Sequence, residues 1–448
     1  MPRRWMSCSL LALAACGCSW TRFDEVSEDA PVVQLKRPEE TSGFGVSLAT
    51  AAITGRSQVL VGGASGISAA ATFELGDGQN PTLDSIDLGA CRTGDALCFL
   101  GDRTAGLPVA TYPGGVPGAG TLCFALGLGE TNLNQRGVLF RCDDDTEYAQ
   151  AAPEPANALI DQAVQGFARA VVTLASDRDG EPAVIVGSHE LQRSWFYWPG
   201  TINSPISLVP SSATPDESYG TTVAIARVPG ARIFAVGAPA EGHVWLYRSS
   251  DGATVEPLGC LALSAGFGRA LAAGPVVSSA NDDLVISDER QVMVLAGTAL
   301  AQLPASASSE CSFGGLPAGG VVASFTCASE HGLESCGRSR FGAALAVGDV
   351  DGDGDGEVAV GGPGFSLRGE REAGGVIVFD AEGPNPERRT DVKFLSSGEE
   401  GDQLGQAVAM ARIGERDVLI AGAPGGKKTA VFYCTSLLTG GAAGPRCQ

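Results

Sequence analysis

A short motif recurs along this chain and constrains its fold more than any other feature. The motif is a large apolar or aromatic residue, followed by glycine in all clear copies but one, and then by two short apolar runs with a turn between them. The clear copies start at Phe44, Phe167, Tyr219, Phe267, Phe341 and Leu404. From Phe167 onward the starts lie 48 to 74 residues apart, and the long gap before Phe167 leaves room for one degraded copy around residues 105–142. A period of this size predicts a repeat protein, in which each unit buries its apolar faces against its neighbours.

The hydrophobic pattern inside each unit indicates strands. Its apolar runs are short or alternating, and glycine and proline bound them, which is typical of β-strands joined by tight turns. A further apolar run closes each of seven units, at residues 71–73, 138–140, 195–197, 244–247, 292–295, 376–379 and 431–433. Seven units of about four strands predict an all-β fold, namely a seven-bladed β-propeller of four-stranded antiparallel blades.

The N-terminal part of the repeat region predicts how such a ring would close. Residues 32–35 form a strand-like run similar to those that precede later motif starts, such as residues 206–209 and 392–395. After Cys434 only a short glycine-rich tail remains. We therefore expect residues 32–35 to pair into the last blade, because closure removes an exposed sheet edge. The propeller domain is expected to span residues 30–448.

The motif also carries a family resemblance. Its Phe-Gly start and its Gly-Ala-Pro end, seen at residues 237–239 and 422–424, resemble FG-GAP repeats. These repeats build the propeller of integrin alpha chains and of many bacterial surface proteins. The resemblance covers roughly residues 30–434 and is weakest in the second unit. It implies a propeller that binds a protein or a glycan. The motif residues themselves are expected to serve packing, since the aromatic ring fills space between blades and glycine permits tight turns.

The first residues have the pattern of an export signal. Two arginines near the start precede the apolar run 10–15, which is far shorter than the ~20 residues of a membrane-spanning helix. The sequence Leu-Ala-Ala-Cys ending at Cys16 resembles the bacterial lipobox, which implies a lipid on Cys16. Because Gly17 follows instead of aspartate, the resemblance favours an outer-membrane lipoprotein facing the periplasm or the cell surface. Residues 1–15 would be the signal peptide and residues 16–29 the tether. The alternative is an ordinary cleaved signal with Cys16 incidental.

The thirteen cysteines agree with export. In an oxidising compartment, cysteines that cluster locally predict disulfides. A zinc site would need a CxxC pair together with a second such pair, and the sequence has none. The candidate pairs are Cys91 with Cys98, Cys123 with Cys142, Cys260 with Cys311, Cys327 with Cys336, and Cys434 with Cys447. The connectivity cannot be fixed from sequence. Residues 305–338, in the longest spacing between the starts from Phe167 onward, are expected to form a disulfide-pinned functional loop.

An acidic stretch in the sixth unit predicts a calcium site. Its acidic residues are Asp349, Asp351, Asp353, Asp355 and Glu357. Carboxylates at positions 1, 3, 5 and 9, with Gly354 at position 6, suit a hard cation in a tight loop, and Asp355 would contribute its backbone carbonyl. An EF-hand would need glutamate at position 12, where Val360 stands, whereas the FG-GAP pattern uses position 9. Five acidic groups repel one another unless a cation lies among them. The alternative is a solvated acidic turn.

A second calcium loop is conceivable in the third unit. Asp177 and Asp179 remain there, but Ala175 and Ala183 stand where two ligands would be needed. The sequence leaves this second site open.

Charge and histidine content narrow the function. A net charge of −21 argues against nucleic-acid binding, because phosphates would be repelled. The three histidines, His189, His243 and His331, lie in different units without a nucleophile motif, so no reaction is predicted. The expected function is an envelope-anchored, monomeric, calcium-binding propeller that mediates protein or glycan binding or adhesion and touches the membrane only through its lipid. The alternatives are a polysaccharide hydrolase or lyase on a propeller scaffold, and a structural envelope component.

Overall fold

The computed structural model describes most of the repeat region. The described residues are 20–22, 32–35, 43–53, 56–62, 70–75, 82–86, 109–114, 121–128, 137–142, 147–151, 167–174, 183–188, 192–197, 206–210, 216–251, 254–277, 280–306, 311, 316–327, 338–350, 354–366, 370–381, 393–396, 399–413, 416–426 and 430–433. The expected signal peptide, with Cys16, lies outside them.

The described strands form seven sheets, which we number after the repeat units. The first holds β3 (Ser47–Ile53), β4 (Arg56–Gly62), β5 (Ala70–Leu75) and β6 (Thr82–Ile86). The second holds β7 (Val109–Gly114), β8 (Thr121–Leu128), β9 (Gly137–Cys142) and β10 (Glu147–Ala151). The third holds β11 (Phe167–Leu174), β12 (Ala183–Ser188), β13 (Arg193–Tyr197) and β14 (Ile206–Leu208). The fourth holds β15 (Thr222–Val228), β16 (Ala231–Ala238), β17 (His243–Ser249) and β18 (Glu256–Ala262).

The remaining three sheets follow the same plan. The fifth holds β19 (Leu271–Gly274), β20 (Asp283–Ser287), β21 (Gln291–Leu295) and β22 (Val321–Thr326), with the short helix α2 (Gly297–Ala301) after β21. The sixth holds β23 (Ala344–Gly348), β24 (Glu357–Gly361), β25 (Val376–Phe379) and β26 (Lys393–Ser396). The seventh holds β27 (Ala407–Ile413), β28 (Arg416–Gly422), β29 (Ala430–Tyr433) and β2 (Val32–Leu35). Neighbouring strands within a unit pair antiparallel, so the fold is all-β.

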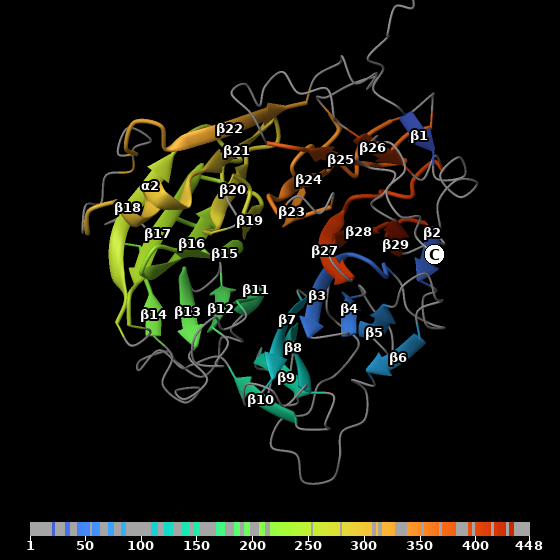
Figure 1. Ribbon diagram of the computed structural model, residues 1–448, viewed down its shortest axis with the longest axis horizontal. Helices are drawn as coiled ribbons and strands as arrows, with labels where there is room; N and C mark the ends of the chain where they lie inside the picture. Colours follow the sequence, from blue (N-terminus) through green and yellow to red (C-terminus); the bar gives the residue numbers. More distant parts are fainter. Residues whose placement is uncertain are drawn as a thin grey trace, which may run out of the picture.

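The sheets are arranged side by side about a common centre (Figure 1). The first strand of each sheet is innermost and contacts the first strand of the next, in the order β3, β7, β11, β15, β19, β23 and β27. β27 in turn contacts β3. This arrangement is propeller-like.

The N-terminal strands pair with sheets from the end of the chain. β2 lies antiparallel to β29, with Val32 opposite Tyr433 and Leu35 opposite Ala430. β1 (Trp20–Arg22) lies parallel to β26 and makes the sixth sheet five-stranded. The segment expected to be a tether thus contributes one short edge strand.

The expectation of one loop over residues 305–338 is wrong for its middle part. Residues 321–326 are β22, which pairs with β21 as the outer strand of the fifth sheet. The physical reason is alternation, because Ala323 and Phe325 are buried while Ser324 is partly exposed and Thr326 is exposed. The long segment between the motif starts of the fifth and sixth units therefore contains a strand. The prediction, which relied on the positions of the cysteines, missed it.

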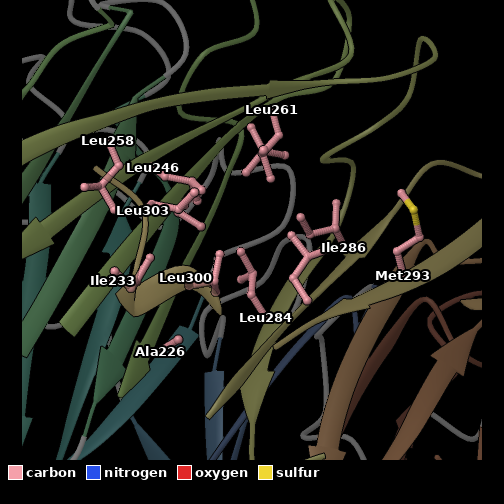
Figure 2. Close-up of a cluster of buried hydrophobic side chains, with 14 of the residues drawn as sticks. Ala226, Ile233, Leu246, Leu258, Leu261, Leu284, Ile286, Met293, Leu300 and Leu303 are labelled. Carbon is pink, nitrogen blue, oxygen red and sulfur yellow. The ribbon is translucent and has the colours of Figure 1, made fainter. Parts of the chain in front are cut away.

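Apolar side chains fill the space between neighbouring sheets. Figure 2 shows the cluster between the fourth and fifth sheets, where Ile233 and Leu246 meet Leu284 and Ile286, with Leu300 of α2 beside them. The motif residues lie in the same kind of position. Phe44, Tyr219, Phe267, Phe341 and Leu404 all have no exposed surface.

The glycine after each of these residues adopts a left-handed backbone. Its φ is between +78° and +93° at Gly45, Gly220, Gly268, Gly342 and Gly405. Each donates its N–H to a carbonyl near the end of the second strand of its own unit, as Gly405 does to Gly422 at 2.9 Å. This conformation favours glycine, because a Cβ destabilises it in other residues.

Candidate functional site

The predicted calcium loop connects β23 and β24 of the sixth sheet. Asp349 follows the end of β23, and Glu357 begins β24. Asp351 and Asp353 lie outside the described residues, whereas Asp355 is described and half-buried. Gly354 has a φ of +100°, which explains why glycine stands at position 6 of this loop.

Glu357 turns its carboxylate back over the start of the loop. Its side chain is buried, and Oε2 accepts the Val350 N–H at 2.6 Å. The side chain at position 9 therefore reaches the backbone at position 2. An anionic oxygen on a buried side chain at this place fits a hard cation, which prefers oxygen ligands. In the part of the chain that the structure describes, no group of three or more His, Cys, Asp or Glu side chains converges on one point.

Asp349 is tied to the seventh sheet. Its N–H donates to Asp417 Oδ2 at 2.8 Å, and the Asp417 N–H donates to the Asp349 carbonyl at 2.7 Å. The guanidinium of Arg412 lies 3.5 Å from Asp349 Oδ2 and 3.6 Å from Asp417 Oδ1. Burial is the largest effect on Asp417 and raises its pKa, although hydrogen bonding and Arg412 act in the opposite direction. Sequence reasoning missed Arg412 and Asp417 because they belong to the next unit.

The inner strands also line a cavity of about 240 Å³ near the centre of the ring. Its walls come mainly from β15 and β19 and present polar and apolar surface in equal parts. Asp282 is the one carboxylate in this lining, and Arg227 engages it with Nε at 3.2 Å and Nη2 at 3.3 Å.

Among the histidines, His243 is described and has an acidic neighbour. Its Nδ1 lies 3.0 Å from Asp216 Oδ2, and the same oxygen accepts the Trp245 Nε1–H at 2.7 Å. His189 and His331 lie outside the described residues. Asp216 is buried, so its contact with Trp245 fixes an indole in the core of the fourth sheet.

The predicted cysteine pairs are described only in part. Cys260 of β18 and Cys311 form a disulfide, with Cα atoms 4.7 Å apart. Cys123 and Cys142 lie directly opposite each other on β8 and β9. Cys327 follows β22, and its Sγ is 3.9 Å from Ser339 Oγ. Cys91, Cys98, Cys336, Cys434 and Cys447 lie outside the described residues, as do Asp177 and Asp179 of the third unit.

One known repeat family matches part of this architecture. The FG-GAP repeat family matches residues 341–379, which hold the acidic loop and β23 to β25. No curated protein matches the chain. Among solved structures, the chain is similar to an arginine-to-alanine triple mutant of AofleA from Arthrobotrys oligospora, at 10% identity and a TM-score of 0.43, over 83% of this chain and 91% of that one. The arrangement of the seven sheets and this family match make the chain a β-propeller-like protein that contains an FG-GAP repeat. Within its described part, no helix is long and apolar enough to cross a membrane.

Proposed function

We propose that the protein is an envelope-anchored β-propeller that binds a protein or glycan partner and catalyses no reaction. The observation that carries this proposal is the FG-GAP repeat at residues 341–379 within a ring of antiparallel sheets. By analogy, such propellers act as rigid binding platforms, and analogy of fold alone does not fix the partner.

The ring is proposed to be a closed propeller of seven blades. Three observations support closure. β2 pairs with β29, β27 contacts β3, and Gly422 of the seventh sheet packs on the carbonyl of Gly45 in the first unit. The pairing of β2 supplies the outer strand of the last blade and covers the edge that β29 would otherwise expose.

Calcium is proposed to occupy the loop of the sixth blade. Asp349, Asp351, Asp353 and Glu357 would supply carboxylates, and Asp355 would supply its carbonyl. The buried carboxylate of Glu357 and the left-handed Gly354 support this ligand set. The cation would hold two strands of one blade together, because all its ligands come from one short connection.

The anchor is proposed to be a lipid on Cys16, which would place the propeller at the outer membrane, facing the periplasm or the cell surface. Metabolic labelling with a radioactive fatty acid tests this. The full chain should incorporate label, and Cys16→Ser should not. Label in both would contradict the anchor.

The binding function is tested with the purified full-length protein. It is applied to a glycan array and used to capture partners from envelope extracts, with calcium and with chelator. Saturable binding without turnover supports the proposal. Release of shorter products from a polysaccharide would instead support a hydrolase or lyase, and absence of any partner from both assays would support a structural component.

A further inference from the structure

Neighbouring sheets are joined by hydrogen bonds at equivalent places in the repeat. We define the exit residue as the one eight positions after the motif start, where the first strand ends. The exit residues considered below are Arg227, Pro275, Asp349 and Arg412, each of which faces a clamp residue in the next unit. In each of those next units, a residue at the end of the second strand accepts the N–H of the motif glycine through its carbonyl. We define the clamp residue as the one five positions before that acceptor. The clamp residues facing those exit residues are Asp282, Gly356, Asp417 and Ser57.

Two junctions have the same reciprocal pair of bonds. Between the fourth and fifth sheets, the Asp282 N–H donates to the Arg227 carbonyl at 2.8 Å, and the Arg227 N–H donates to Asp282 Oδ2 at 2.8 Å. Between the sixth and seventh sheets, Asp417 and Asp349 repeat both bonds, at 2.7 and 2.8 Å. The two junctions share geometry although Arg227 and Asp349 are opposite in charge. The backbone of the exit residue is therefore what the clamp residue recognises.

The junction between the fifth and sixth sheets shows why the carboxylate is present elsewhere. There the Gly356 N–H donates to the Pro275 carbonyl at 2.6 Å, so the first bond of the pair is kept. Proline has no N–H, so the second bond cannot form and no acceptor is needed. The clamp residue is glycine, which has no side chain. At these three junctions, the acidic group is present where the exit residue has an N–H to satisfy and absent where proline removes it.

The junction between the seventh and first sheets uses a weaker version. The Ser57 hydroxyl donates to the Arg412 carbonyl, so the same exit carbonyl is bound by a neutral side chain. Bonds to an ionised acceptor are stronger than bonds between neutral groups. This junction, where the two ends of the repeat region meet, therefore lacks the charge-assisted bond of the two aspartate junctions, as the Pro275 junction also does.

We infer that this reciprocal bonding is a clamp that fixes the height of each sheet relative to the next, and that its aspartate serves to satisfy the exit N–H. The apolar packing between sheets is non-directional and permits sliding, whereas a backbone–backbone bond opposed by a backbone–carboxylate bond permits one register. Asp282 and Asp417 are largely buried, and a buried carboxylate is tolerated when hydrogen bonds satisfy it. The inference holds whether or not calcium binds.

A double-mutant cycle on the full chain tests the clamp at the fourth–fifth junction. Arg227→Ala and Arg227→Pro are compared in two backgrounds, the natural Asp282 and Asp282→Gly. Both exit variants lack the guanidinium, so the comparison isolates the backbone N–H. The Asp282→Gly background reproduces the natural Pro275 and Gly356 combination. Intrinsic costs of proline and glycine cancel in the cycle.

With Asp282 present, proline should lower the folding equilibrium constant at least about tenfold relative to alanine, because it leaves a buried carboxylate without its donor. With Asp282→Gly, the same change should lower the folding equilibrium constant about threefold or less, because no carboxylate remains that could lose its hydrogen-bond donor. Equal losses in the two backgrounds would overturn the inference.

Hydrogen exchange of the natural protein gives a second, independent test. The Arg227 amide should be protected as strongly as the amides of the β15–β16 ladder, and Asp282→Gly should release it selectively. Fast exchange of the Arg227 amide in the natural protein would also overturn the inference, even if the proline variants failed to fold.

Discussion

Gly422, at the end of β28, packs directly on the carbonyl oxygen of Gly45, and a Cβ on Gly422 would lie far inside 3.0 Å of that oxygen. The same relationship joins Gly361 to Gly405 and Gly237 to Gly268, each pair belonging to two consecutive units. The glycine at the end of the second strand thus contacts the backbone of the motif glycine in the next unit. In the pair Gly422 and Gly45 the next unit is the first one.

This contact predicts that Gly422→Ala destabilises the protein by about 1–3 kcal/mol, because two backbones must separate. Chemical denaturation measures the loss, and Gly361→Ala is the matched control at the sixth–seventh junction. If the ring is closed in solution, the two variants lose similar stability. If Gly361→Ala lowers the unfolding free energy and Gly422→Ala leaves it unchanged, the first and seventh sheets are not packed together.

The repeat made the architecture predictable because each unit carries its own strand pattern. The closing run of every unit lies in a third strand, from β5 to β29, and residues 32–35 pair with β29. What the sequence could not supply was contact between units. Ser287 illustrates this, since it stands where other units have glycine, and its hydroxyl bonds to the carbonyl of Gly342 at 2.7 Å. The replacement is understandable only when both units are seen together.

Phe341 should be required for packing and replaceable by another large apolar residue. It is fully buried, and its ring lies 6.1 Å from that of Phe379 at an interplanar angle of 84°. Phe341→Ala should cost about 3–5 kcal/mol through the cavity it leaves. Phe341→Leu should cost less than ~1.5 kcal/mol, because the seventh unit uses Leu404 at this position. Urea unfolding distinguishes the two, and equal losses would contradict the packing role.

Asp283 should make stability rise on acidification. Burial is the largest effect and raises its pKa above the usual value of 3.8, although Gly297 and Val277 donate backbone N–H groups to its carboxylate. The folded state therefore binds the proton more tightly than the unfolded state does. The contribution of Asp283 to the free energy of unfolding should increase as pH falls through the folded pKa towards 3.8, and decrease as pH rises through the same range.

The measurement compares the natural protein with Asp283→Asn over that range. The difference in unfolding free energy between the two should move in favour of the natural protein as pH falls. A difference that stays constant with pH would show that Asp283 has the same pKa in both states. Other acidic groups affect both proteins equally and cancel.

The candidate site shows where sequence reasoning ends. The acidic spacing from Asp349 to Glu357 and the glycine at 354 are local, so the loop could be recognised from one unit. Arg412 and Asp417 could not, because their meeting with Asp349 depends on how the seventh sheet lies on the sixth. Their signal becomes visible only when the units are aligned, since Arg412 occupies the same exit position as Asp349.

Calcium should stabilise the folded protein through the loop of the sixth sheet. Extracellular modules of this type bind calcium with dissociation constants on the order of 10⁻⁴–10⁻³ M, and a tenfold excess over the dissociation constant would add about 1.4 kcal/mol. Thermal melts of the full chain with calcium and with chelator measure this. The natural protein should lose stability on chelation, and the variant with Asp351→Ala and Asp353→Ala should not respond.

The matched control for calcium is Asp251→Ala, which removes an acidic residue from an exposed turn of the fourth unit. There the two oxygens of Asp251 accept bonds from the Thr254 hydroxyl at 3.0 and 2.9 Å. Asp251→Ala should lose some stability but keep the full response to calcium, because its carboxylate is remote in sequence from the loop. All three proteins could show the same response to calcium. Calcium would then act by screening the negative charge of the whole protein, and the loop would be a solvated acidic turn. If the loop variant alone is insensitive, the cation lies among the residues between Asp349 and Glu357.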